Sequence, residues 1–212
     1  MIIKMEKEYR QLREAYEAKE NRLVILSGRC KTGKTTLVKQ FVQEYQGYYY
    51  QAAECARERQ KQLLNLCWDR FYGNEQSEEL PSAISRIQQT VSRNTYLGIF
   101  SEMCRRREGR TLIVIEDFNR IAKNDPDFYG DLVKLLEQEE HLMLLLTVST
   151  LNWREEEANV EPRSLVGKIT DRIVLREFGF LEIIKFFKGL PMVDVVQIYA
   201  LLGGIPGYLK YW

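Results

Sequence analysis

An eight-residue run at positions 28–35, GRCKTGKT, constrains this chain more than any other feature. It satisfies the pattern GxxxxGK[ST] at every fixed position. A polyphosphate needs several converging N–H donors with no side chain in the way, and a glycine-rich loop that leads into a helix supplies them. Gly28 and Gly33 permit the backbone angles and the close approach that a Cβ would block. The run therefore predicts a phosphate-binding loop.

The residues on either side of this phosphate loop support that interpretation. Residues 22–27 (RLVILS) are nearly all apolar, which is typical of a buried parallel strand. After the loop, apolar side chains recur at helical spacing as far as Tyr45, and Gly47 could end the helix. A glycine-rich turn that matches the pattern by chance is the alternative, and it would not require a strand before it and a helix after it.

The loop predicts a site for Mg-ATP. Lys34 is expected to reach the β- and γ-phosphates, and Thr35 to ligate Mg²⁺ through its hydroxyl. The motif does not distinguish ATP from GTP, but no NKxD-type guanine signature follows, which favours adenine. The residues expected to bind the nucleotide through the loop are Gly28, Arg29, Cys30, Lys31, Thr32, Gly33, Lys34, Thr35 and Thr36.

Apolar runs alternate with helical patterns along the chain, and this alternation predicts the fold class. Buried strands are expected at residues 111–115, 142–150 and 169–175, with helices between them. Such alternation implies right-handed crossovers and a mostly parallel sheet. We expect an α/β, three-layer P-loop NTPase fold with helices on both faces in residues 1–176, including an N-terminal helix. Residues 177–212 are expected to begin a small helical lid.

An acidic pair, Glu116 and Asp117, follows the strand predicted at residues 111–115. In P-loop enzymes an aspartate at such a strand end orders the Mg²⁺ shell, and in many ATPases a following glutamate polarises the attacking water. Here the two acids stand in the reverse order. By position, we assign Glu116 to the metal and Asp117 to the water. Asp117 is one methylene shorter than the usual base, which predicts slow hydrolysis; the alternative is a solvent-facing acidic strand end.

Hydroxyl side chains end the strand predicted at residues 142–150. Ser149 or Thr150 could touch the γ-phosphate or the attacking water, as a sensor does. Because serine and threonine often cap strand ends, a purely structural role for them is an equally good interpretation.

Four segments resemble the archaeal-type P-loop ATPases of the STAND branch, relatives of the AAA+ proteins. That family has a segment like FxxREKEL before the phosphate loop, and residues 2–9 here read IIKMEKEY. Its loop often reads GRRRxGKT, its acidic motif IDEFQ and its later segments LYGR and GGIPxYL. This chain has GRCKTGKT, then IEDFN at residues 115–119, LVGK at 165–168 and GGIPGYL at 203–209.

The resemblance implies further expectations about the site. The GGIPGYL turn would begin the lid and lie against the nucleotide, so Pro206 becomes a candidate adenine-side contact; a helix stop followed by a rigid turn is the alternative. Met5 and Lys168 stand where the family has arginine, and the acids are swapped. These departures imply that binding is retained better than hydrolysis. Because the family usually has a longer lid and a further C-terminal domain, we expect a truncated lid here.

Composition narrows the remaining function classes. The 212 residues carry 31 basic and 30 acidic side chains, so no global field indicates a nucleic acid or a membrane surface. Arg105, Arg106, Arg107 and Arg110 form a basic cluster that could meet nucleic acid, although a solvated helix end is favoured. Four widely spaced cysteines and one histidine do not predict a zinc site. A charged N-terminus and the lack of a long apolar run predict a cytoplasmic protein without a membrane span.

Together these features predict an ATPase that works as a nucleotide-dependent conformational switch and hydrolyses ATP slowly. Its expected cofactors are ATP or ADP and Mg²⁺, and its expected partner is another protein or a second copy. The residues given catalytic roles are Lys34, Glu116, Asp117 and Ser149. A regulatory nucleotide-binding scaffold without useful catalysis is the first alternative. A DNA-handling ATPase and a P-loop kinase are the others.

Overall fold

A computed structural model describes residues 5–72, 94–149 and 163–209 of the chain. Five strands form one sheet in the order β2-β3-β4-β1-β5, and every neighbouring pair is parallel. The strands are β1 (Arg22–Gly28), β2 (Tyr48–Gln51), β3 (Thr111–Glu116), β4 (Leu142–Val148) and β5 (Asp171–Leu175). The α/β fold with a parallel sheet is thus confirmed.

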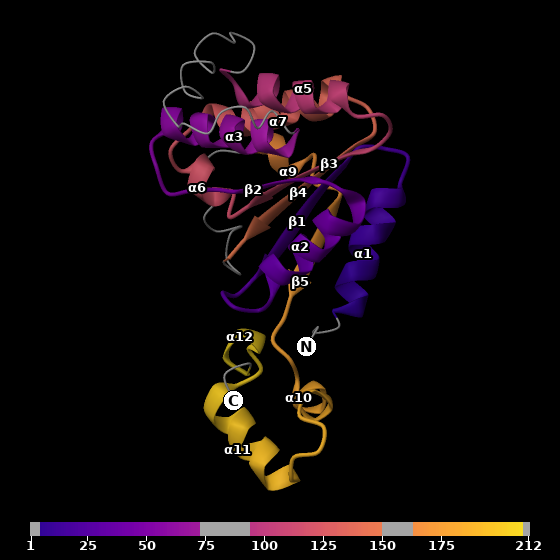
Figure 1. The fold of residues 1–212 in the computed structure, drawn as a ribbon, viewed down its shortest axis with the longest axis vertical. Coiled ribbons are helices and arrows are strands. Elements are labelled where there is room, and N and C mark those ends of the chain that lie inside the picture. Colours follow the sequence, from indigo (N-terminus) through magenta and orange to yellow (C-terminus); the bar gives the residue numbers. More distant parts are fainter. Residues whose placement is uncertain (1–4, 73–93, 150–162, 210–212) are drawn as a thin grey trace.

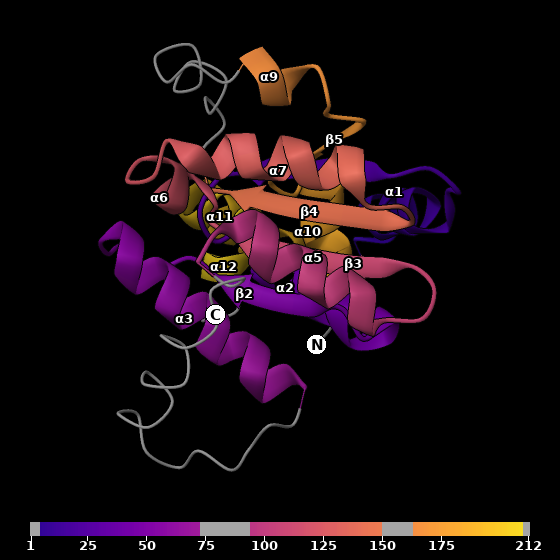
Figure 2. The same cartoon turned by 90° about the horizontal axis from the view of Figure 1, so that it is seen from above.

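The helices of the described residues lie on both faces of this sheet and beyond its edge. They are α1 (Glu6–Glu17), α2 (Lys34–Tyr45), α3 (Arg57–Phe71), α5 (Tyr96–Arg106), α6 (Asn119–Ala122), α7 (Asp127–Gln138), α9 (Arg163–Val166), α10 (Phe180–Phe186), α11 (Met192–Leu202) and α12 (Pro206–Leu209). Figures 1 and 2 show α1 and α2 on one face of the sheet and α3, α5 and α7 on the other.

Two hydrophobic clusters explain these layers. Successive side chains of a strand point to opposite faces, so a strand buried on both faces is apolar at every position. In β1, Leu23 and Ile25 pack in the cluster beneath α3, α5 and α7, whereas Val24 and Leu26 pack in the cluster beneath α1 and α2. The apolar run that predicted this strand therefore serves two cores.

The sheet order places three strand ends side by side. Strand β4 lies between β1 and β3, and all three run in the same direction. Their carboxyl ends carry the phosphate loop, Ser149 and the acidic pair, which are far apart in the sequence. Ligands of open α/β sheets bind at this edge.

A third, smaller cluster belongs to the segment after β5. Ile183, Val195, Ile198 and Leu209 form the buried centre of α10, α11 and α12. Figure 1 shows these helices apart from the layers of the sheet, below the end of β5. They lie within residues 177–212, for which a lid stays a prediction, and residues 210–212 lie outside the described part.

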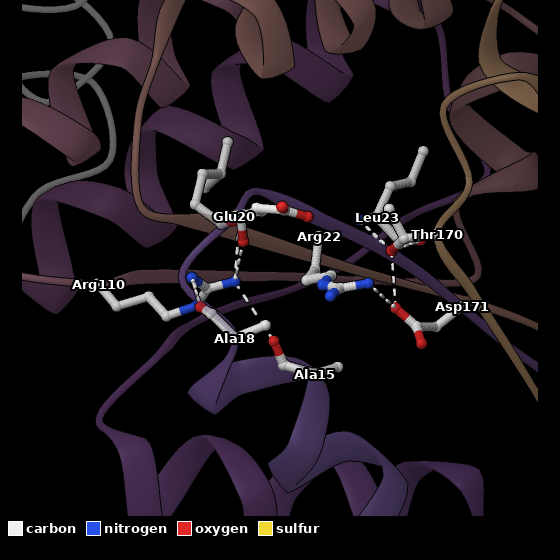
Figure 3. Close-up of polar contacts among 9 residues, drawn as sticks. Ala15, Ala18, Glu20, Arg22, Leu23, Arg110, Thr170 and Asp171 are labelled. Atoms are coloured by element: carbon white, nitrogen blue, oxygen red, sulfur yellow. Dashed lines mark hydrogen bonds and ion pairs between the residues drawn. The ribbon is translucent and has the colours of Figure 1, made fainter.

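Arg110 joins α1 to the sheet. Its guanidinium donates to the carbonyl oxygens of Ala18, Glu20 (2.8 Å) and Ala15 (3.3 Å), around the end of α1, as Figure 3 shows. Burial of this side chain lowers the pKa of Arg110, and nearby Arg22 lowers it further. The last carbonyls of a helix have no partner within the helix, so an arginine that reaches them replaces missing capping bonds.

The basic cluster of Arg105, Arg106, Arg107 and Arg110 divides into two parts. Arg107 donates to the carbonyls of Gln46 and Tyr45 at the end of α2, at 2.6 and 2.7 Å, so Arg107, like Arg110, holds a helix end in place. Arg105 and Arg106 are exposed at the end of α5, as expected of a solvated helix end. Arg106 also pairs with Glu102 of the same helix at 3.0 Å, and its guanidinium lies 4.7 Å from the centroid of the Trp68 ring.

Within residues 5–72, 94–149 and 163–209, every helix is too short or too polar to cross a membrane.

Candidate functional site

The phosphate loop runs from the end of β1 to the first turn of α2. A Cβ at position 28 would lie 2.6 Å from the carbonyl oxygen of Leu175, so only glycine fits between β1 and β5. Gly33 has φ +101° and Lys31 has φ +65°, both in the left-handed region. Thr32 is buried, and its hydroxyl donates to the carbonyl of Arg29 at 2.8 Å. The glycine requirement that the motif implied is met.

Lys34 folds back beneath this loop from the first residue of α2. Its ammonium donates to the carbonyl oxygens of Gly28 and Arg29, each at 2.8 Å, and the residue is only 5% exposed. Burial lowers the pKa of Lys34, while the nearby charges of Asp117, Cys30 and Glu116 oppose that shift. A buried ammonium beside the first residues of a helix is a strong site for an anion.

Glu116 lies at the end of β3, 3% exposed, between two hydroxyl groups. The hydroxyl of Thr35 donates to its Oε1, and the hydroxyl of Tyr49 donates to its Oε2. Tyr49 comes from β2, the edge strand beside β3. Thr35 and Glu116, the two residues predicted to hold the metal, therefore lie in direct contact.

Asp117 follows β3 and is not part of the strand. Its φ is +54°, so the chain turns immediately after β3 and the two acids diverge. The hydroxyl of Ser149 donates to its Oδ1 at 2.7 Å, and Arg120 pairs with its Oδ2 at 3.4 Å. Its backbone N–H donates to the hydroxyl of Thr147 on β4 at 3.2 Å. This turn, and not the alternation of side chains along a strand, directs the two acids apart.

The donor set fits a magnesium nucleotide. Thr35 and Glu116 offer the hard oxygen ligands that Mg²⁺ takes, and Mg²⁺ is usually held by one or two protein groups together with phosphate oxygens and waters. Among the described residues, no group of three or more His, Cys, Asp or Glu side chains could hold a metal ion.

The segment after β5 (residues 176–209) contacts the phosphate loop directly. The N–H of Gly207 in α12 donates to the carbonyl of Lys31 at 2.9 Å. The ammonium of Lys31 lies 4.6 Å from the centroid of the Tyr208 ring, and Arg29 forms an ion pair with Glu177. The two exposed cations of the loop thus face the segment after β5.

The N-terminal segment approaches the same loop. A Cβ on Gly33 would lie 2.3 Å from the terminal methyl carbon of Met5, so the Met5 side chain covers this glycine. Pro206 is buried at the start of α12, one residue from the Gly207 contact. Met5 and the turn that contains Pro206 therefore approach the loop from two different segments.

The predicted residues thus gather at one edge of the sheet, with some differences in exposure. Cys30 is an exposed free thiol, and Thr36 is exposed on α2. Thr150 lies outside the described residues. Tyr49 and Arg120 contact the acidic pair but were not singled out from the sequence. The only signal for Tyr49 was the aromatic run at residues 48–50, which does not indicate which hydroxyl reaches a carboxylate.

Comparison with known proteins identifies the family of this chain. The sequence model of a family described as an ATPase domain predominantly from Archaea matches residues 5–212. An uncharacterised protein of Methanocaldococcus jannaschii is 20% identical over 215 residues, which cover 99% of this chain and 44% of that protein.

Solved structures share the fold. A Walker-type ATPase of Pyrococcus abyssi superposes with a TM-score of 0.75 at 18% identity, covering 98% of this chain and 65% of that one. The Orc1 protein of Aeropyrum pernix, solved in complex with DNA, superposes with a TM-score of 0.61 at 16% identity, covering 99% and 58%. This chain therefore spans less than half of the curated relative and less than two thirds of either structure.

Proposed function

This chain belongs to the family of ATPase domains found predominantly in Archaea, and from that premise we propose that it binds Mg-ATP, hydrolyses it slowly and acts as a conformational switch. The observation that carries the proposal is the convergence of Lys34, Thr35, Glu116 and Asp117 at the ends of β1 and β3. Its placement within the STAND branch is part of the same proposal.

Each residue has a separate role in this proposal. The backbone of residues 28–36 and the ammonium of Lys34 bind the phosphates, and Thr35 and Glu116 hold Mg²⁺, which neutralises charge on the phosphate oxygens. Asp117 accepts a proton from the attacking water, and Ser149 orients Asp117 through their 2.7 Å hydrogen bond. Adenine lies between the Met5 segment and Pro206.

Slow hydrolysis follows from the surroundings of Asp117. Its carboxylate is one methylene shorter than that of the usual general base, and Arg120 pairs with its Oδ2 at 3.4 Å. A base must lie within hydrogen-bond reach of the water it activates. We expect a turnover below about 1 s⁻¹, the lower end of the usual range for enzymes.

The contacts between loop and lid support the switch. Arg29 and Lys31 are bonded to the segment after β5, while their own backbone belongs to the phosphate loop. Phosphates attract cations, so nucleotide binding competes for these two side chains. A ligand shifts a conformational equilibrium only through such differential contacts.

Asp117→Asn tests the enzymatic part of the proposal. Asparagine keeps the shape and the hydrogen bond from Ser149 but cannot accept the proton, so ATP turnover should fall at least tenfold. Affinity for Mg-ADP should stay within about threefold, because the diphosphate does not involve the water. Turnover by phosphate release and affinity by calorimetry are the measurements. Equal turnover in both proteins would leave only a regulatory nucleotide-binding scaffold.

Two other activities have their own tests. Stimulation of turnover by duplex DNA would indicate a DNA-handling ATPase, although the described arginines of the basic cluster are mostly bonded within the protein. Transfer of phosphate to a metabolite, in place of release to water, would indicate a kinase.

A further inference from the structure

Tyr49 lies at the metal side of the candidate site, and nothing above requires it there. It pairs in register with Val114, two residues before Glu116 on the neighbouring strand, and packs with the cluster beneath α2. Val114 and Glu116 share one face of β3 because side chains alternate along a strand. The Tyr49 side chain therefore lies on the same face and reaches Glu116.

The two oxygens of Glu116 have different partners. Oε1 accepts from Thr35, which the proposed function makes the other protein ligand of Mg²⁺, and Oε2 accepts from Tyr49. The tyrosine hydroxyl thus occupies the oxygen away from Thr35 and leaves Oε1 directed at it. Hydrogen bonds to an ionised acceptor are stronger than those between neutral groups, so they can fix a carboxylate.

The length of the Glu116 side chain explains why the hydrogen bond from Tyr49 matters. Glutamate has one more rotatable bond than the aspartate usual at this strand end, and each free rotamer lost on metal binding reduces affinity. A hydrogen bond that holds the carboxylate in advance removes part of that cost.

We infer that Tyr49 is a positioning residue for the divalent cation, which it serves by holding the longer carboxylate of Glu116 toward Thr35. The inference rests on the proposed function, since it assumes that Thr35 and Glu116 bind the cation of a magnesium nucleotide. Tyr49 of β2 thereby compensates for the presence of a glutamate, in place of the usual aspartate, at the end of β3.

Tyr49→Phe tests this inference with a readout other than catalysis. Mn²⁺ is the probe, and its affinity for the ADP-bound full chain is measured by electron paramagnetic resonance. Loss of the hydroxyl should weaken Mn²⁺ binding about ten- to hundredfold, the range that corresponds to a hydrogen bond to a charged group. ADP affinity in EDTA should stay within twofold, because the phosphate loop is untouched.

Tyr50→Phe is the matched control. Tyr50 is the next residue of β2 and lies in the cluster on the opposite face of the sheet, and its buried hydroxyl has no hydrogen-bond partner among the described residues. Its removal should leave Mn²⁺ affinity unchanged. Thermal melting of both variants shows whether each is folded.

A second comparison uses Glu116→Asp. The shorter carboxylate should not reach the Tyr49 hydroxyl, so Tyr49→Phe should have no further effect on Mn²⁺ affinity in that background. Such a cycle isolates the pair even if either single variant is less stable.

The other outcomes overturn the inference in distinguishable ways. If Tyr49→Phe leaves Mn²⁺ affinity within twofold, or weakens ADP binding equally in EDTA, Tyr49 does not position the metal ligand, and the proposed function stands. If the wild-type chain binds no nucleotide under either condition, the proposed function fails and the inference fails with it.

Discussion

At the scale of single residues, the reversed acidic pair is the chief departure of this site. Glu116 lies between two hydroxyl groups, whereas Asp117 faces Ser149 and Arg120 after a turn with positive φ. The longer acid thus points to the phosphate loop and the shorter one to β4. An exchange of the two acids would alter both environments, because one contacts hydroxyls of α2 and β2 and the other a hydroxyl of β4.

Ser149→Ala separates the functional from the structural interpretation of Ser149. Removal of its hydroxyl frees one oxygen of Asp117, so ATP turnover should fall about three- to tenfold as the base loses its orientation. Mg-ADP affinity should not change, because ADP lacks the γ-phosphate. Phosphate release and calorimetry measure the two quantities.

Ser149→Thr keeps the hydroxyl and serves as the control. If Ser149→Ala turns over ATP as fast as the wild type, the hydroxyl is no more than a strand cap.

At the scale of elements, long side chains from the segment before β3 hold two helix ends in place. Arg110 caps α1 and Arg107 caps α2, and these two helices cover one face of the sheet. The first turn of α2 carries Lys34 and Thr35, so the placement of this helix also sets the phosphate loop. Arg107 and Arg110, two of the four arginines in the basic cluster, therefore act inside the molecule.

Arg110→Ala should destabilise the fold by about 2 kcal/mol, because several carbonyls at the end of α1 lose a charged donor. Arg105→Ala, which removes an exposed arginine from the end of α5, should change stability by less than about 0.5 kcal/mol. Urea unfolding followed by circular dichroism measures both. Equal effects would show that the capping contacts add nothing.

At the scale of the whole molecule, three parts of the chain meet at the carboxyl ends of the strands. The layered core holds the phosphate loop, the N-terminal segment touches it at Gly33, and the small cluster of α10, α11 and α12 touches it at Lys31. A ligand bound in the loop would thus contact or displace parts of each. In the proposed switch, a nucleotide bound in the loop would therefore link the layered core to the segment after β5.

Mg-ATP should therefore stabilise the whole chain against heating. At 100 times its dissociation constant a ligand adds about 2.7 kcal/mol to the free energy of unfolding. For a chain of this size that corresponds to a rise in Tm of about 5–10 °C. Differential scanning fluorimetry with and without Mg-ATP measures it. Lys34→Ala should show a rise of less than about 2 °C, and an equal rise in both proteins would place the nucleotide elsewhere.

Local patterns were sufficient for most of the fold. The phosphate loop, the strand before it, the helix after it and the apolar run before the acidic pair were predicted because a buried parallel strand is apolar at every position and a helix repeats every 3.6 residues. Residues 177–212 were expected to begin a small helical lid, and α10 and α11 lie there, at Phe180–Phe186 and Met192–Leu202. The short helices α6 and α12 were not predicted, since a single turn leaves no period.

The contacts within the candidate site could not be predicted from the sequence and became known only from the tertiary structure. Thr35, Tyr49 and Glu116 come from three elements, and a sequence does not state which hydroxyl of three consecutive tyrosines faces a carboxylate, because a shift of one residue in register reverses the faces. The direction of Asp117 depends on one positive φ, and the roles of Arg107 and Arg110 depend on helix ends about 60 to 95 residues away. The chemistry of the phosphate loop is local and can be read from eight residues, whereas the partners that orient it are brought together by the packing of the sheet.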